Sequence, residues 1–168
     1  MALSEYNIQS SSQFVVIFPE LPGREAADVR RNLPLELHVT NTILPGLSFD
    51  VTDTSHIYKH QEVSGRIIYD PWTFGFLVDE QLKNYRILFE WFQYVHKNFG
   101  IAHSKSEYSV DASLELRTAY GKTAKLFTFR YIYPAALAEL TWNYQERAFI
   151  EGEATFNYDY MEMVSGPL

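Results

Sequence analysis

Carboxylates are the side chains of this 168-residue chain whose type and spacing most readily suggest chemistry. Glu151 and Glu153 lie two residues apart where apolar and polar residues alternate, so both side chains project from one face of an extended strand. A pair of carboxylates can carry out acid and base catalysis at a glycosidic bond. Carboxylates on the polar face of a strand are more often solvated than catalytic, and solvation is our preferred interpretation.

Histidines are the second group that suggests chemistry, as metal ligands. His56 and His60 have the i, i+4 spacing of two ligands on a helix. The residues from Thr52 to His60 lack helical periodicity, however, and no glutamate lies between the two histidines as it does in zinc proteases. The remaining histidines are isolated in the sequence: His38, His96 and His103. Solvated histidines are therefore the favoured interpretation, and no metal site is predicted.

Motifs of nucleophilic and phosphate chemistry are missing from the sequence. Ser64-Gly65 and Ser165-Gly166 lack the upstream glycine that a nucleophile elbow needs. The eight glycines are scattered singly, so no glycine-rich loop can cradle a phosphate. There is no cysteine to act as nucleophile, thiolate ligand or disulfide partner. We expect no enzymatic activity and no cofactor.

Composition limits the partners of the chain. Fourteen basic and 21 acidic residues give a formal charge of −7, which disfavours a surface that grips nucleic acid phosphates. An acidic wall that repels DNA remains compatible with this charge. The first 13 residues lack the basic and apolar regions of a secretory signal, and no apolar stretch is long enough to span a bilayer. We expect a soluble chain that does not insert into a membrane.

The elements that must position these side chains are mostly strands. Twelve Tyr, 12 Phe and 3 Trp favour β structure, and alternating patterns support it. Strand candidates are 13–21, 35–49, 62–78 with a break at Asp70-Pro71, 108–118, 124–133 and 148–161, and Pro134 could open a short helix. Residues 50–61 are a loop or a ragged hairpin. The length predicts one domain over 1–168, with a flexible segment at 1–12 and a charged loop at 22–34.

One main helix interrupts the strands. From Asp79 onward, apolar residues follow a helical period, Asp79 can cap the helix, and Gly100 can end it. We expect Leu88, Phe89 and Phe92 to be buried against the sheet. Trp91 lies at the edge of this stripe, which suggests more apolar surface than one sheet covers and hence a neighbouring subunit. The predicted fold class is mostly β, a β-barrel or sandwich with one main flanking helix.

Aromatic residues of this region have two interpretations. Trp72, Phe74, Tyr85, Phe89, Trp91 and Phe92 could line a ligand cavity, as in a lipocalin-like carrier. Packing between the helix and the sheet is the simpler explanation, and we prefer it.

Four stretches together resemble the tail tube proteins of contractile-tailed bacteriophages. They are LPGLSF at 44–49, VSGRIIYDPWTFGFLVDEQLKNYRILFEWF at 63–92, LFTFRYIYPAALAELTW at 126–142 and ATFNYDYM at 154–161. The similarity lies in the order and spacing of these stretches, because none of them is a catalytic motif. It extends over most of the chain from about Phe14.

The resemblance implies a structural subunit of a virion. Such subunits form stacked hexameric rings, assembled in the host cytoplasm, whose lumen conducts the genome during ejection. Implied partners are other copies of the chain and the tail sheath, baseplate and tail terminator proteins, while DNA passes without specific binding. Related alternatives are a baseplate protein that initiates the tube and the tube protein of a type VI or other contractile injection system.

Two sets of residues are candidates for roles in such a tube. Alternation on the two acidic strands gives one set, for which we expect at least one strand to line the channel: Asp111, Glu115, Glu151, Glu153 and Asp159. The aromatic helix gives the other set, for packing or subunit contact: Leu88, Phe89, Trp91 and Phe92.

Overall fold

The computed structural model describes residues 13–18, 21–22, 38–56, 59–98, 104–118, 120–144 and 148–165. The elements in chain order are β1 (Phe14–Ile17), β2 (Val39–Thr42), β3 (Leu47–His56), β4 (Lys59–Tyr69), β5 (Trp72–Leu77), α2 (Lys83–Asn98), α3 (Lys105–Tyr108), β6 (Val110–Arg117), β7 (Thr123–Leu137), β8 (Glu151–Asn157) and β9 (Tyr160–Ser165). The predicted segment at 1–12 and the predicted loop at 22–34, apart from Pro22, lie outside the described residues.

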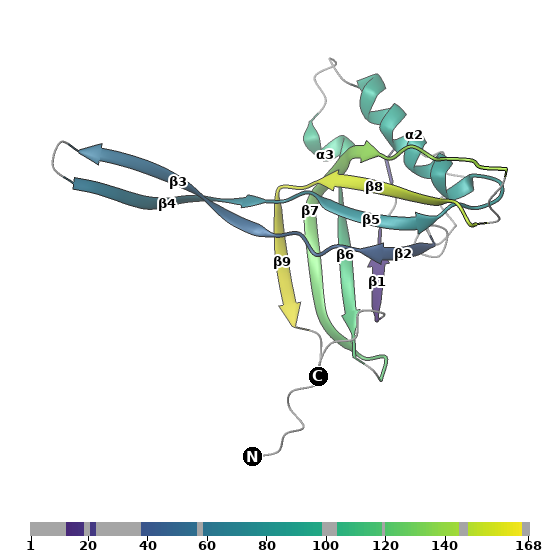
Figure 1. Ribbon diagram of the computed structural model, residues 1–168, viewed down its shortest axis with the longest axis horizontal. Coiled ribbons are helices and arrows are strands. Elements are labelled where there is room, and N and C mark those ends of the chain that lie inside the picture. The colour runs from purple at the N-terminus through teal and green to yellow at the C-terminus, as the bar shows by residue number, and fades with distance from the viewer. Residues whose placement is uncertain are drawn as a thin grey trace.

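The body is a sandwich of two sheets that share strand β7 (Figure 1). The first half of β7 pairs with β6 and β9, and the second half pairs with β8. The continuous order is β1-β6-β7-β8-β5-β2, all antiparallel. We call the β1, β6, β7, β9 part the first sheet and the β2, β5, β8 part with the end of β7 the second sheet. The predicted mostly β class is confirmed as a sandwich, because the sheet does not close into a barrel.

Aromatic rings fill the space between the two sheets. Trp72, Phe74, Phe76, Phe129 and Phe156 are fully buried. The Trp72 ring from β5 stacks on the Phe129 ring from β7, with centroids 4.4 Å apart, so one contact joins the two sheets. Offset stacking of such rings adds to the free energy of burial. The alternation read from Trp72, Phe74 and Phe76 is therefore the core face of β5.

Helix α2 begins later than its sequence predicts, at Lys83. Leu82 has a φ of 55°, and the fully buried Asn84 organises the turn before the helix. Its side-chain nitrogen donates to the Leu77 carbonyl at 2.5 Å, and its oxygen accepts from the Asp79 backbone N–H at 3.1 Å. The prediction of Asp79 as the helix cap is wrong, because the helix begins four residues later, at Lys83. The Asn84 amide supplies both a donor and an acceptor to the turn between them.

The buried stripe of α2 is rotated relative to the predicted one. Ile87, Leu88 and Trp91 are buried, Phe92 is half-buried, and Phe89 is 46% exposed. Trp91 donates from Nε1 to the Tyr108 carbonyl at 3.0 Å and stacks on Phe156, with centroids 5.6 Å apart. Burial of Phe89 and an exposed edge at Trp91 were thus wrong expectations. The Trp91 indole can be buried in the core because its only polar atom, Nε1, has a hydrogen-bond partner.

Strands β3 and β4 form a long hairpin that projects from the body (Figure 1). Of residues 50–61, for which the sequence left a loop or a ragged hairpin open, 50–56 belong to β3 and 59–61 belong to β4 of this hairpin. The hairpin is a separate two-stranded sheet, which the chain connects to the second sheet because β3 follows β2 and β4 precedes β5. Its base carries exposed apolar side chains: Leu47, Phe49, Ile67 and Ile68, with exposed fractions of 58%, 60%, 40% and 44%.

Two predicted elements are corrected around β7 and β8. Pro134 does not open a helix, because β7 runs through it to Leu137. The missing proline N–H is tolerated there because a bulge lies between Pro134 and Ala136. The single strand predicted at 148–161 is divided into β8 and β9, since Asp159 donates its backbone N–H to the Arg130 carbonyl at 3.0 Å as the chain changes sheets.

Candidate functional site: two acidic faces

The outward face of the second sheet carries Glu151 and Glu153. Both side chains are exposed, and they alternate with Gly152, Ala154 and Phe156, which are buried. Gly152 is required at its position because a Cβ there would lie 2.7 Å from the Phe76 ring. The glutamates therefore point away from the core, and the core contacts of the strand fix that direction.

Uncharged residues lie next to these glutamates on the neighbouring strand. Glu153 is opposite Gly75 on β5, and Glu151 is opposite Leu77. Thr155 is opposite Thr73, and the two hydroxyl oxygens lie 3.1 Å apart, within hydrogen-bond distance. Helix α2 lies on the other side of this sheet, because Trp91 stacks on the inward-facing Phe156 ring. Neither glutamate has an ion-pair partner within the part of the chain that the structure describes.

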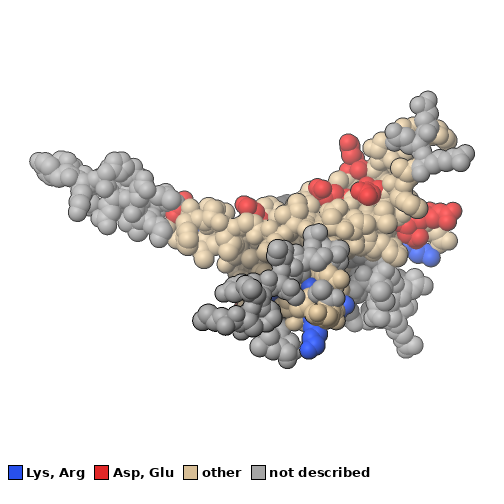
Figure 2. Space-filling model, turned by 60° about the horizontal axis from the view of Figure 1, so that its bottom comes forward, with Lys and Arg blue, Asp and Glu red and all other residues tan. Residues whose placement is uncertain are grey.

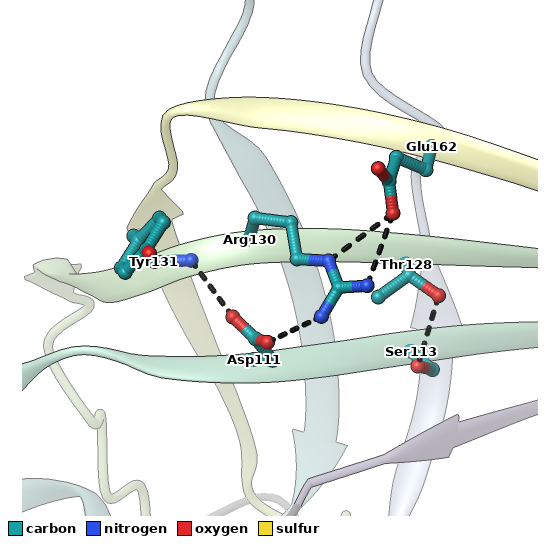
Figure 3. Close-up of polar contacts among 6 residues, drawn as sticks. All are labelled: Asp111, Ser113, Thr128, Arg130, Tyr131 and Glu162. Atoms are coloured by element: carbon teal, nitrogen blue, oxygen red, sulfur yellow. Dashed lines mark hydrogen bonds and ion pairs between the residues drawn. The ribbon is translucent and has the colours of Figure 1, made fainter. Parts of the chain in front are cut away.

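The outward face of the first sheet carries the other acidic row, and its charges are paired (Figure 3). Asp111 on β6 accepts from Arg130 Nη1 at 2.6 Å and from the Tyr131 backbone N–H at 3.1 Å. Arg130 also donates to Glu162 on β9, from Nη2 at 3.1 Å and from Nε at 3.2 Å. The two carboxylates raise the pKa of the Arg130 guanidinium, Asp111 having the larger effect. One arginine thus joins three strands.

Glu115 is also compensated on this face. Arg117 donates to its carboxylate from Nε at 3.1 Å, and the Thr123 hydroxyl donates to the same carboxylate. The Arg117 hydrogen bonds, followed by that from Thr123, lower the pKa of Glu115 below its ordinary value. Charge-assisted hydrogen bonds favour the ionised carboxylate, so this group stays negative to lower pH than a free glutamate.

Asp159 belongs to neither row. It forms an ion pair with Lys105 of α3, and the Lys105 ammonium also lies 4.9 Å from the centre of the Tyr133 ring. The five acidic residues predicted to face a lumen are therefore not brought together. Glu151 and Glu153 share one outward face, Asp111 and Glu115 share the opposite one, and Asp159 lies at the turn between β8 and β9.

The sequence reasoning missed Arg130 and Glu162. A signal was present, because Thr128 and Arg130 are polar residues that alternate with Phe127 and Phe129 on β7. Only the register of the sheet shows that Arg130 is next to Asp111, since the two are 19 positions apart in sequence.

Figure 2 shows acidic side chains at intervals along one side of the body, across from the lowest group of basic side chains.

The structure favours packing over a ligand cavity for the aromatic residues. Trp72, Phe74 and Trp91 are at most 1% exposed. Phe18 contacts all three rings, with centroids 5.7 to 6.5 Å away. A pocket is present elsewhere, lined among others by Glu139, Trp142 and Phe149 in the connection between β7 and β8. In the described parts of the chain, no helix is long and apolar enough to cross a membrane.

Comparison with known proteins gives a family and a fold. A family model described as phage tail tube protein matches residues 4–163. No curated protein sequence matches the chain.

Three solved structures illustrate the likeness in fold. A chain of the anti-feeding prophage cap, the tube-terminating cap, has a TM-score of 0.67 at 12% identity, covering 99% of this chain and 100% of that one. A chain of the extended PVC sheath–tube complex, an extracellular contractile injection system, has a TM-score of 0.64 at 13% identity, covering 98% of this chain and 99% of that one. Hcp1 from Salmonella typhimurium has a TM-score of 0.50 at 12% identity, covering 90% of this chain and 84% of that one.

Proposed function

The chain belongs to the phage tail tube protein family, and we propose that it is the subunit of hexameric rings that stack into a tube and conduct the genome during ejection. The family makes it a structural component of a phage tail. The proposal assigns it no reaction and no cofactor. Its partners are other copies of the chain and the sheath, baseplate and terminator proteins of the tail.

The observation that carries the proposal is the outward face of the second sheet. Glu151 and Glu153 are exposed there without counter-ions among the described residues, beside the small polar residues Thr73 and Thr155. Helix α2 does not cover this face, because it packs on the opposite side of the sheet. A channel wall needs such a surface, since DNA must pass along it without binding. We therefore place this face on the lumen and the paired face of the first sheet on the outside.

Electrostatics gives the wall its function. Carboxylates repeated around a ring repel the phosphates of DNA in the channel. Screening limits this repulsion to about 8 to 10 Å at physiological salt, so it acts close to the wall. Asp111, Glu115 and Glu162 suit this role less well because arginines compensate them. Of the two faces, the one that bears Glu151 is thus the better wall.

The projecting hairpin supports self-association. Leu47, Phe49 and Ile67 lie on the same face of the β3–β4 ribbon, because Phe49 is opposite Ile67 and Leu47 is opposite Tyr69. All three are exposed, at 40% or more. A two-stranded ribbon with a bare apolar face is marginal alone and is stabilised when another surface covers it. We assign the cover to a neighbouring subunit of the tube.

Charge reversal on the wall tests the function. Phage particles that carry Glu151→Lys with Glu153→Lys in every subunit should assemble, since both side chains are exposed. Their genome release should be slower, because the lysines attract the phosphates that the glutamates repel. The slowing should decrease as the ionic strength rises, because salt screens the attraction. The measurement is the rate of DNA release in an ejection assay over a range of salt.

A matched control separates this effect from net charge. Glu80→Lys with Glu107→Lys makes the same change in charge at two exposed positions outside β8, one in the turn before α2 and one on α3. These particles should release DNA at the parental rate. Unchanged release from particles proven to contain the Glu151 and Glu153 substitutions would contradict the proposed wall, as would equal slowing by the control pair.

A further inference from the structure

Strand β7 changes partners at a corner, and the corner has an unusual backbone. Residues up to Arg130 pair with β9, and residues from Tyr133 pair with β8. Between them, Tyr131 has a φ of 54°. Positive φ is uncommon for a residue with a bulky side chain, and surrounding contacts must hold it in place. Something at this corner must therefore compensate for the conformation of Tyr131.

The strand opposite the corner is irregular at the same level. The β6–β7 register shifts between Val110, which is opposite Ile132, and Ala112, which is opposite Phe129. Asp111 lies in that shift, and Tyr131 is not a paired residue of any ladder that β7 forms. An unpaired N–H group needs another acceptor. Asp111 Oδ1 is that acceptor, at 3.1 Å from the Tyr131 nitrogen.

The second oxygen of Asp111 ties the corner to its neighbours. It accepts from Arg130 Nη1 at 2.6 Å, while the same guanidinium holds Glu162 of β9 (Figure 3). The Arg130 carbonyl accepts the backbone N–H of Asp159, the residue before β9, so the main chain of Arg130 holds the entry to β9 while its side chain binds Glu162 within that strand. One carboxylate thus contacts the strained residue directly and, through Arg130, the strand at which the first sheet ends.

We propose that Asp111 is the latch of the β7 corner: a positioning residue that holds Tyr131 in its left-handed conformation and thereby sets how the two sheets are oriented. The bond to the Tyr131 N–H is the essential contact, and the ion pair with Arg130 fixes the carboxylate that makes it. A solvated surface ion pair would contribute little and would not bind a backbone group. The latch concerns the fold of each subunit and is independent of the role of the tube.

Amide hydrogen exchange in the full-length chain tests the latch at the Tyr131 N–H. Asp111→Ala removes the acceptor, and exchange at Tyr131 should become about tenfold faster or more than in the parent. Asp111→Asn keeps an oxygen in place, and exchange should rise by less than about threefold. Ser113→Ala is the matched control on the same face of β6, where the Ser113 hydroxyl lies 3.5 Å from that of Thr128. It should leave exchange at Tyr131 unchanged.

A glycine at the corner supplies the second measurement. Glycine adopts positive φ without strain, so Tyr131→Gly should remove most of the need for a latch. In that background, Asp111→Ala should lower the Tm by less than half as much as it does beside Tyr131. If Asp111→Ala alone fails to fold, the glycine variant should restore folding. Equal losses in the two backgrounds, failure of restoration, or parental exchange at Tyr131 in Asp111→Ala would overturn the proposal.

Discussion

The β8 face and the β6 face of the sandwich have the same sequence pattern, but their carboxylates differ in whether a counter-ion lies beside them. In both strands, an acidic residue alternates with a core residue. On the β6 face, Arg130 and Arg117 compensate Asp111, Glu115 and Glu162. On the β8 face, the neighbouring positions on β5 are Thr73, Gly75 and Leu77, which carry no charge. The pairing strands therefore determine on which face the carboxylates lack counter-ions and on which face arginines compensate them.

The largest expected effect concerns the core that both faces share. Phe156 is fully buried behind the β8 glutamates and contacts Phe74, Trp72 and Trp91. Phe156→Ala should lower the free energy of unfolding by about 3 to 5 kcal/mol, through lost transfer energy and the cavity left behind. The measurement is chemical unfolding followed by tryptophan fluorescence.

Phe89→Ala is the control for this core substitution. Phe89 is 46% exposed on α2, so its truncation should cost well under half as much as that of Phe156. Equal costs at the two positions would mean that the rotated stripe of α2 is incorrect.

The next effect separates the two faces. Arg130→Ala leaves Asp111 and Glu162 without their shared counter-ion and should lower the Tm. Glu151→Gln with Glu153→Gln removes two charges that have no counter-ion among the described residues, and the Tm should stay within about one degree of the parent. Thermal unfolding at low and high salt measures both. A larger loss in the glutamine pair would reverse our assignment of paired and unpaired faces.

A smaller effect should appear only in acid. The Arg117 hydrogen bonds hold the pKa of Glu115 below 4.5 in the folded chain, so the folded state binds fewer protons here than the unfolded state does. The resulting stability is present above about pH 4.5 and is lost as the pH falls through the lowered pKa. Glu115→Gln should therefore flatten the fall in Tm below pH 4.5. A Glu115→Gln variant whose Tm falls below pH 4.5 as steeply as that of the parent would contradict this prediction.

The smallest effect should appear in alkali. Burial raises the pKa of the Tyr158 hydroxyl to about 12, and this hydroxyl has no hydrogen-bond partner among the residues that the structure describes. The folded state therefore keeps a proton that the unfolded state loses near pH 10, and stability falls as the pH rises from 10 toward 12. Tyr158→Phe should be neutral or slightly stabilising at pH 7 and should weaken that alkaline loss. A clear drop in Tm at pH 7 would show that the hydroxyl has a partner.

Local patterns predicted much of the fold. Trp72, Phe74 and Phe76 alternate with period two because one side of β5 faces the core, and such a pattern is visible without any partner. The helix was found in the same way. The orientation of the helix was not predicted, because Trp91 is buried through contacts with Phe18, Phe156 and Tyr108, none of which lies on the helix itself.

The candidate site was less predictable for the same reason. Alternation showed that Asp111 and Glu151 point outward, but the proximity of Arg130 to Asp111 depends on the register of β6 and β7. The prediction of the α2 cap was also wrong, because the Asn84 amide forms hydrogen bonds with the preceding residues Leu77 and Asp79. Sequence periodicity specifies the face of a strand, whereas charge pairing is a property of neighbouring strands.

The orientation of the sandwich in the assembled tube is the central claim, and cryo-electron microscopy of tubes formed by the purified chain tests it most directly. We predict sixfold rings in which the face bearing Glu151, Glu153, Thr73 and Thr155 lines the channel. Arg130, Asp111 and Glu162 should lie on the outer surface. A tube with Arg130 and Asp111 on the channel wall and the β8 glutamates outside would contradict the account.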